Sequence, residues 1–326
     1  MRRLRAFCVS ALLLYGISAF AGNVTGTLYF TTFSGGANVH SVGFTYNPGV
    51  SFTLGSVTDL TPTPGADGLL FDPLNANLMV AGQSSGFVSE EPKTGGTVTN
   101  VNVGPAGQSY HLALTSNNSA VWNMANGQNA FISVVPLPFN SAAGTSYPVT
   151  GSDTDIRGVI FDPVTSQYYY TTAPDGGQGN FGTIVFNGSS FVTTRIQSGL
   201  WAHGISYDPF SKDLIINSGN FIQQINTAGT VLGTLTGPGN FDQAAENGKG
   251  LLFVASNSGY LEFADYAATG NIQTATFTTA PFLAGSLDDI APLSGQGAPT
   301  PEPGTLLLLG TSVAGVTAML RRKLKA

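Results

Sequence analysis

The sequence is nearly without cysteine and poor in charge. Its single cysteine, Cys8, lies close to the N-terminus, and only 9% of its residues are charged. Disulfides are therefore excluded, as are thiol nucleophiles and thiolate metal sites beyond Cys8. Between Gly22 and Thr300 the chain has 17 acidic residues against 5 basic ones, a formal net charge of −12. A surface of that sign argues against nucleic acid as a partner.

Amphipathic helical periodicity is also missing from this central region. Glycine, threonine, serine and asparagine stand where a helical protein would carry Glu, Lys and Ala, and short alternating runs of β-branched and aromatic residues are separated by Gly, Asn and Pro. This pattern predicts an all-β domain. The length, some 280 residues, suits one repetitive domain better than two unrelated ones.

The N-terminus has the parts of a secretory signal peptide. Three arginines among the first five residues precede an apolar stretch that runs to Ile17, and Ala19-Phe20-Ala21 supplies a small-x-small pattern. Signal peptidase recognises such a pattern. We expect residues 1–21 to be removed by cleavage after Ala21, so that the mature chain begins at Gly22.

The last 26 residues form a second targeting signal. In order, its parts are Pro301-Glu302-Pro303, an apolar run of 17 residues over 304–320, and the basic cluster Arg321-Arg322-Lys323. The run is at the short end of the length that spans a bilayer as a helix, and the basic cluster would stay in the cytoplasm. The chain before the helix is therefore expected outside the cytoplasm, joined to it by a linker at 294–300.

This arrangement over 301–326 resembles the PEP-CTERM sorting tail of bacterial envelope and exopolysaccharide-associated proteins. In that family a membrane protease of the exosortase type acts at the motif. The resemblance implies an inner-membrane anchor first, and then a place at the cell surface or outside the cell after processing by signal peptidase and an exosortase-like enzyme. A plain single-pass anchor is the alternative, and it leaves the Pro-Glu-Pro motif unexplained.

The middle of the chain repeats one heptad, which reads x-Gly-apolar-x-aromatic-Asp-Pro. Clear copies begin at Asp67, Arg157 and His203, and weaker copies begin at His111, Asp242 and Asp288. The steps between successive starts are 44, 46, 46, 39 and 46 residues. A period of about 40 to 50 residues with several strands in each unit is typical of β-propeller blades.

We expect six blades in the domain at 22–293, the sixth of them built from both ends of the domain. The last repeat keeps only an inner strand over 288–293, whereas three strand-like runs before the first repeat, at 27–33, 40–46 and 51–57, have no inner strand. Pairing these segments closes the ring and removes its open edges. Seven blades is the alternative if a weak repeat is miscounted.

The repeats resemble those of NHL, YVTN and SMP-30-like propellers. In this broad group extracytoplasmic members bind polymers or partners, and some members are metal-dependent lactonases or lyases. The resemblance implies the architecture, but it transfers no catalytic signature to any residue of this chain.

All six residues at the first position of the repeat are ionisable, in a domain where such residues are rare. They are Asp67, His111, Arg157, His203, Asp242 and Asp288. Because equivalent positions are related by rotation about the propeller axis, we expect these side chains to converge near one mouth of the central channel. Trp201 is a further candidate there, either stacked on a sugar or packed between blades.

Three interpretations of this ring stay open. The charges satisfy one another in a wet channel, or they bind a polar ligand with Arg157 as a bidentate donor. In the third interpretation His111, His203 and Asp242 hold a divalent metal that activates water. The favoured function is accordingly a noncatalytic binding protein for a polysaccharide or an envelope protein, and the alternative is a metal-dependent hydrolase or lyase.

Overall fold

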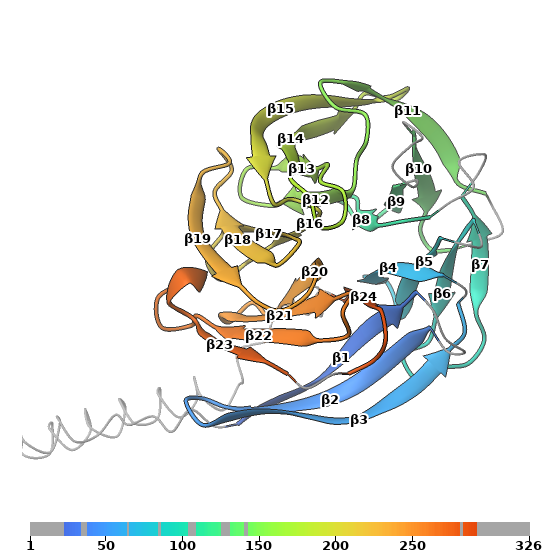
Figure 1. Cartoon of the computed structure of the whole chain (residues 1–326). Coiled ribbons are helices and arrows are strands. Elements are labelled where there is room, and N and C mark those ends of the chain that lie inside the picture. Colours follow the sequence, from blue (N-terminus) through green and yellow to red (C-terminus); the bar gives the residue numbers. More distant parts are fainter. Residues whose placement is uncertain are drawn as a thin grey trace, which may run out of the picture.

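The computed structural model describes residues 23–33, 38–63, 65–83, 86–103, 109–124, 131–139, 143–280 and 283–291. Within these ranges the chain forms 24 strands and one short 3-10 helix, η1 (Ile272–Thr274). The strands form four-stranded units arranged around a central axis (Figure 1). The expected all-β propeller is therefore confirmed. The signal peptide, the cleavage site at Ala21 and Gly22, the linker, the Pro301-Glu302-Pro303 motif and the C-terminal helix lie outside the described residues.

Five of the units follow the repeats in order, each from an inner strand outwards. The first contains β4 (Ala66–Phe71), β5 (Leu78–Gly82), β6 (Phe87–Glu91) and β7 (Thr99–Asn102). The second contains β8 (Leu112–Leu114), β9 (Ala120–Met124), β10 (Phe131–Pro136) and β11 (Thr145–Gly151). The third contains β12 (Gly158–Asp162), β13 (Gln167–Thr171), β14 (Gly179–Phe186) and β15 (Phe191–Leu200). The fourth contains β16 (Gly204–Tyr207), β17 (Leu214–Ser218), β18 (Phe221–Ile225) and β19 (Val231–Thr236). The fifth contains β20 (Phe241–Glu246), β21 (Leu251–Ser256), β22 (Leu261–Asp265) and β23 (Thr276–Thr279).

A parallel pairing of β11 with β15 joins the second and third units at their outer edges.

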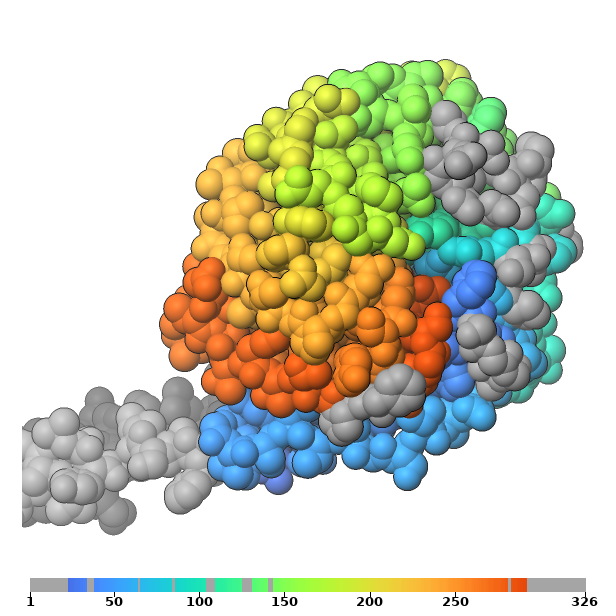
Figure 2. Space-filling view, in the orientation of Figure 1, coloured from blue at the N-terminus to red at the C-terminus, as the bar shows by residue number. Residues whose placement is uncertain are grey.

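The remaining unit combines the two ends of the domain, and we call it the split blade. It consists of the inner strand β24 (Leu287–Ile290) followed outwards by β1 (Val24–Thr32), β2 (Val39–Asn47) and β3 (Ser51–Thr61). Phe30 of β1 is the partner of Ile290 in β24. Figure 2 shows the same closure on the surface, where the blue N-terminal strands lie beside the orange and red C-terminal ones. The described residues thus form six four-stranded units rather than seven.

The inner strands β4, β8, β12, β16, β20 and β24 form a closed ring, because each contacts the next and β24 contacts β4. The second strands lie between neighbouring blades, and every residue of β5, β9, β17 and β21 is buried. A strand covered on both faces needs a continuous apolar run, such as Leu214-Ile215-Ile216. The outer strand β15, in contrast, is mostly exposed.

Aromatic side chains fasten the split blade to the unit before it. The ring centroids of Phe44 and Phe253 are 4.9 Å apart, and Phe52 stacks on Phe263 at 4.3 Å. The Tyr46 hydroxyl also donates a hydrogen bond to Asp265. Because these contacts join residues from opposite ends of the domain, burial of these rings stabilises the closed ring.

The Asp-Pro step of the heptad makes the same turn after three inner strands. A carboxylate oxygen of Asp72, Asp162 and Asp208 accepts a hydrogen bond from the backbone N–H two residues later, at 2.7, 2.8 and 3.0 Å. Aspartate favours such turns because its short side chain reaches its own backbone. The turn fixes where each second strand starts.

The glycine at the second position lets neighbouring inner strands approach closely. A Cβ on Gly68 would lie 2.8 Å from the Cα of His111, and a Cβ on Gly204 would lie 2.2 Å from the carbonyl oxygen of Asp242. Both contacts are to a first-position residue of the next repeat. These glycines therefore hold the first positions of adjacent blades close together.

The described part of the chain contains no helix with the length and hydropathy of a membrane span.

Candidate functional site

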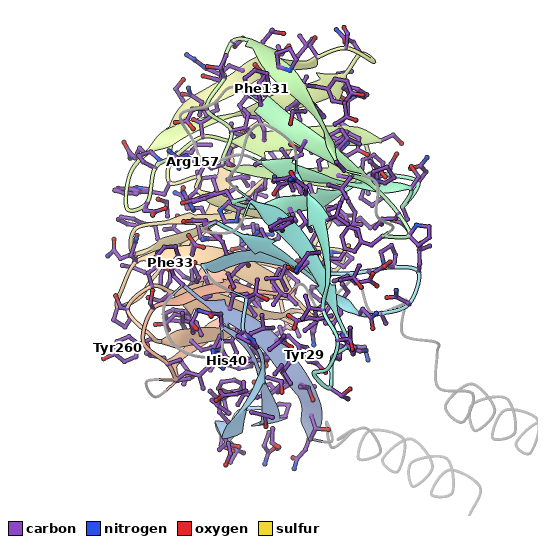
Figure 3. All side chains as sticks on the ribbon, turned by 90° about the vertical axis from the view of Figure 1, so that its right-hand side faces the viewer. Tyr29, Phe33, His40, Phe131, Arg157 and Tyr260 are labelled. Carbon is purple, nitrogen blue, oxygen red and sulfur yellow. The ribbon has the colours of Figure 1, made fainter. Side chains whose placement is uncertain are left out.

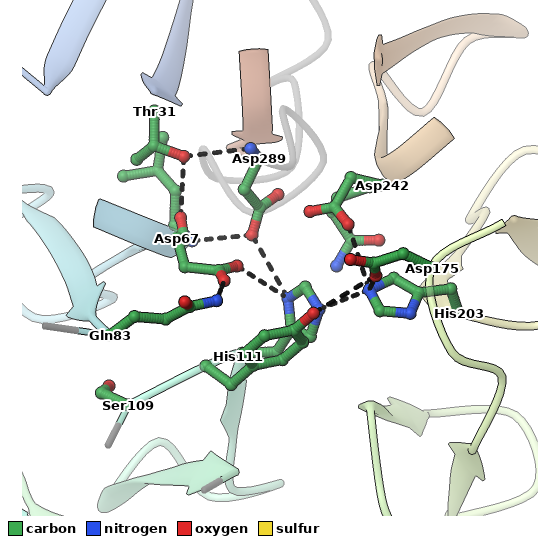
Figure 4. A network of polar contacts seen from close by, with 12 residues as sticks. Thr31, Asp67, Gln83, Ser109, His111, Asp175, His203, Asp242 and Asp289 are labelled. Carbon is green, nitrogen blue, oxygen red and sulfur yellow. Dashed lines mark hydrogen bonds and ion pairs between the residues drawn. The ribbon is translucent and has the colours of Figure 1, made fainter. Parts of the chain in front are cut away.

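Seven ionisable side chains meet at the N-terminal ends of the inner strands, and we call them the His–Asp cluster (Figure 4). They are Asp67, His111, Asp175, His203, Asp242, Asp288 and Asp289. Five of them occupy the first position of a repeat, as the sequence predicts. Asp289 follows Asp288 in β24, and Asp175 comes from the loop between β13 and β14.

His203 has the most informative geometry in the cluster. Its Nδ1–H donates to the carbonyl oxygen of Ala173 at 2.8 Å, because a carbonyl can only accept. Its Nε2 lies 3.0 Å from Oδ1 of Asp175 and 3.0 Å from Oδ1 of Asp242. In a neutral ring this Nε2 would present a lone pair to two carboxylates. Unless one of these two carboxyl groups carries a proton and donates it, a proton or a metal ion must lie at Nε2.

His111 also lies close to Nε2 of His203. Its Nε2 is 3.3 Å from Nε2 of His203. Its Nδ1 faces Oδ1 of Asp67 at 3.6 Å and Oδ2 of Asp289 at 3.8 Å, too far for hydrogen bonds. Among the described residues, four buried atoms of the cluster have no hydrogen-bond partner: Asp67 Oδ1, His111 Nδ1, Asp242 Oδ2 and Asp288 Oδ2. Native proteins rarely leave so many buried polar atoms unpaired in one place.

A second layer of contacts fixes the carboxylates. The Gln83 amide donates to Asp67 Oδ2, and the Thr31 hydroxyl donates to the Asp67 carbonyl oxygen at 2.8 Å. The backbone N–H of Leu69 donates to Oδ2 of Asp289 at 2.9 Å. The contact to Thr31, which lies on β1 of the split blade, ties the cluster to the closure of the ring.

Six of the seven cluster residues are buried, and Asp175, whose side chain is 48% exposed, is the one that reaches solvent. His203 is fully buried, and Asp288, at 8% exposure, is the most exposed of the first-position residues in the cluster. Tyr110 covers the two histidines, with its ring centroid 4.6 Å from that of His111 and 5.9 Å from that of His203. The Tyr110 hydroxyl donates to Asp175 at 3.3 Å. This aromatic cover removes the histidines from solvent.

Two predicted site residues form no hydrogen bond or ion pair with the cluster among the described residues, although the pKa of His111 is lowered by burial and further by the charge of Arg157. Arg157 pairs with Asp155 at 3.3 Å and places its guanidinium 5.5 Å from the centre of the Tyr110 ring. Trp201 stacks on Phe221 of its own blade, with ring centroids 4.5 Å apart. Both therefore pack against protein groups. The third histidine of the chain, His40, lies on the split blade, well away from Arg157 (Figure 3).

Burial and crowded negative charge shift the pKa values of the cluster. Burial and the neighbouring carboxylates raise the pKa of Asp67 and Asp288 well above the usual range, and burial raises that of Asp289 to about 8. Burial lowers the pKa of His111 to about 4. Burial also acts to lower the pKa of His203, but the hydrogen bond and charge of Asp242 outweigh it, so the pKa is raised. With five aspartates and two histidines, the cluster has more acidic groups than groups that can carry a positive charge.

Three sets of cluster residues have the arrangement needed to hold a metal ion, with ligand atoms within 4.8 Å of one another. They are His111 with His203 and Asp242, Asp67 with His111 and Asp289, and Asp67 with Asp242 and Asp288. The Nδ1–H bond from His203 to a carbonyl is the orientation that metal-ligating histidines commonly show. The donor set fits a divalent cation.

Sequence reasoning missed Asp175 and Tyr110. Asp175 lies in the glycine-rich stretch Asp175–Asn180, which has no repeat counterpart and reads as a flexible hairpin. Tyr110 directly precedes His111 but lies outside the heptad register. The sequence signal for Tyr110 was its position next to His111. That position does not show that the tyrosine ring packs against both histidines.

Comparison with protein families locates one match, the PEP-CTERM protein-sorting motif at residues 299–323. The chain ends in a PEP-CTERM motif. This motif implies export, sorting to the cell surface and processing by an exosortase. The PEP-CTERM match does not extend into the propeller. No curated protein sequence matches the chain.

Solved structures share the fold of the propeller at low sequence identity. A chain in the crystal structure of the nidogen/laminin complex superposes with a TM-score of 0.63 and 18% identity, over 82% of this chain and 98% of that one. Virginiamycin B lyase from Staphylococcus aureus gives 0.51 and 12%, over 80% and 89%. The calcium-binding protein regucalcin from Agrobacterium tumefaciens gives 0.50 and 14%, over 69% and 77%. At these identities the likeness shows the fold alone.

Proposed function

We propose that this protein is a noncatalytic binding protein of the cell envelope, with a divalent metal ion held at one end of its propeller channel. The sorting motif supports a place at the cell surface. The observation that carries the metal is the donor set of His111, His203 and Asp242, whose ligand atoms lie within 4.8 Å of one another while Nδ1–H of His203 is already donated. The partner class that fits such a tail is an extracellular polysaccharide or another envelope protein.

Ligands of the metal would be His111, His203 and Asp242, the set that combines two imidazoles with a carboxylate. Imidazole nitrogen favours transition-metal ions such as Zn²⁺ over Ca²⁺ or Mg²⁺, which prefer oxygen. A divalent charge at this point would also offset the five aspartates of the cluster. The orphaned Oδ2 of Asp242 and Oδ2 of Asp288 are available as further donors or as partners of a metal-bound water.

The burial of His111, His203 and Asp242 favours a noncatalytic role. A catalytic metal needs an open coordination position that substrate can reach, whereas Tyr110 covers both histidines. The alternative is a metal-dependent hydrolase or lyase, favoured by the same donor set and by Arg157 beside the Tyr110 ring. It requires the tyrosine to move aside. The binding role is supported if the metal-bound wild type hydrolyses no ester or lactone and the Tyr110→Ala variant gains no such activity.

Metal removal tests the proposal directly. We expect the mature exported chain to contain about one divalent ion after dialysis, and to lose it to a chelator with a fall in melting temperature. Re-addition of Zn²⁺ at about 100 times its dissociation constant should restore about 3 kcal/mol of stability. The double variant His111→Ala and His203→Ala should neither retain the ion nor respond to it. Elemental analysis and thermal melts give both readouts.

The matched control is His40→Ala, which removes the chain's third histidine, on the split blade and outside the cluster. It should keep the metal and the response to Zn²⁺. A wild-type chain that binds neither Zn²⁺ nor Mn²⁺ nor Ca²⁺, or a double variant that binds as the wild type does, contradicts the metal site.

A further inference from the structure

A separate cavity of about 260 Å³ lies along the propeller axis, towards the C-terminal ends of the inner strands. Its walls come from five of the six inner strands and the turns after them. Leu112, Val159, Ile160 and Ile205 contribute apolar surface, and the half-exposed Leu114 lies nearer the opening. The exposed rim includes Ser116, Asn118 and Pro163.

One carboxyl group lies in this apolar wall. Glu246, at the end of β20, is fully buried and lines the cavity together with Ser206. The Ser206 hydroxyl donates to Oε1 of Glu246. Oε2 of Glu246 has no hydrogen-bond partner among the described residues. A buried carboxyl oxygen without a partner is costly unless a ligand completes it.

The charge around Glu246 is negative. Asp208 lies close enough to act on its titration: burial and the charge of Asp208 raise the pKa of Glu246 to about 8. Asp208 itself is satisfied, since it accepts bonds from the backbone N–H of Phe210 and from both the N–H and the hydroxyl of Ser211. None of the described residues that line the cavity is basic. The local field favours a cation.

We propose that this cavity binds a small organic ammonium ion, whose apolar group packs against the inner strands and whose N–H donates to Oε2 of Glu246. Such a pair satisfies the orphaned oxygen, and the positive charge of the ligand takes the place of the proton that Glu246 carries without a ligand. The size is suitable, because a cavity of about 150 Å³ holds benzene. A single substituted ring or a short alkyl chain therefore fits. The site lies towards the opposite end of the channel from the His–Asp cluster, and it does not depend on the metal.

Two ligands of matched shape test the proposal on the mature exported chain. Benzylammonium carries the charge, and benzyl alcohol presents the same ring without it. Isothermal titration calorimetry should show benzylammonium binding about tenfold or more tightly than benzyl alcohol, which corresponds to at least about 1.4 kcal/mol. Glu246→Gln keeps the shape of the side chain and should remove that preference, leaving the two ligands about equal.

The control is Glu262→Gln on β22, a second fully buried glutamate that does not line the cavity. It should leave both affinities unchanged. Leu114→Phe fills the cavity without touching a carboxylate and should weaken both ligands together, so the site remains testable if Glu246→Gln fails to fold. Equal binding of the two ligands to the wild type, benzylammonium binding that survives Glu246→Gln, or the absence of any binding at millimolar ligand overturns the proposal.

Discussion

At the scale of single residues, much of the buried charge in this protein lies at the two ends of the inner strands. Asp67, His111, His203 and Asp242 mark one end of the inner strands, and Glu246 marks the other. Away from the axis, Glu91 on β6 and Glu262 on β22 are also fully buried, but the core clusters are apolar and aromatic. Buried ionisable groups cost stability unless they are paired or bind a ligand. The groups at the two ends of the inner strands are the ones on which the two proposed sites rest.

Glu246 gives a prediction with a definite sign. Its pKa is raised from 4.5 to about 8, by burial first and by Asp208 second. The contribution of such an acid to stability is fully present below about pH 4.5 and is lost as the pH rises through about 8. Each tenfold difference in proton affinity between the folded and the unfolded chain corresponds to about 1.4 kcal/mol of folding free energy. Glu246→Gln does not titrate. We expect the wild type to lose stability relative to this variant between about pH 5 and about pH 8.5.

Urea unfolding of both proteins without metal at the two pH values measures this difference directly. Other buried acids, Asp289 among them, titrate in the same range, but they are common to both proteins and cancel in the comparison. Parallel pH profiles for wild type and variant would show that Glu246 is ionised in the folded protein without a ligand, contrary to the argument.

At the scale of strands, the heptad explains how one sequence pattern builds both blade and site. Its glycine brings neighbouring inner strands together, its apolar position fills the blade, and its Asp-Pro step makes the turn into the second strand. Its first residue is left at the axis. The convergence of Asp67, His111 and His203 is thus a consequence of strand geometry.

Gly204→Ala tests this account of the inner strands. An added Cβ would lie 2.2 Å from the carbonyl oxygen of Asp242 and 2.9 Å from Oδ1 of Asn217. Because the first of these is backbone, β16 and β20 must separate, at a cost of about 3 kcal/mol. Gly43→Ala on β2, whose Cβ would meet nothing nearer than 4.0 Å, should change stability by no more than about 0.5 kcal/mol. Similar unfolding free energies for the two variants would contradict the close-approach role.

The spacing of the repeats predicted the strands, but it predicted only part of the site. The fourth unit follows the heptad that begins at His203 and keeps the expected order of four strands. Asp175 was not predictable, because it reaches His203 from a loop whose path no periodic pattern fixes. The burial of the two histidines was also missed: rotation about an axis predicts convergence, but the cover depends on how Tyr110 turns over them.

At the scale of the whole molecule, the two ends of the chain are coupled through the ring. The split blade joins β1 to β24, and Thr31 links that joint to both Asp67 and Asp289. The propeller therefore cannot complete its sixth unit, or its His–Asp cluster, until the C-terminal strand of the domain has been made. Closing the ring last places the sorting tail directly after the strand that completes the fold.

The tail gives the prediction for the whole protein. Replacing Pro301, Glu302 and Pro303 by alanine leaves the apolar run and Arg321-Arg322-Lys323 in place, so membrane insertion should persist while processing stops. Mass spectrometry of the mature protein from its own host should find the C-terminal peptide retained in this variant and absent from the wild type. Alanine at Ser294, Gly295 and Gln296 is the matched control in the linker, and it should be processed normally. If the wild type retains its C-terminal peptide as the variant does, the tail is a simple anchor, and the propeller works from the membrane surface rather than beyond it.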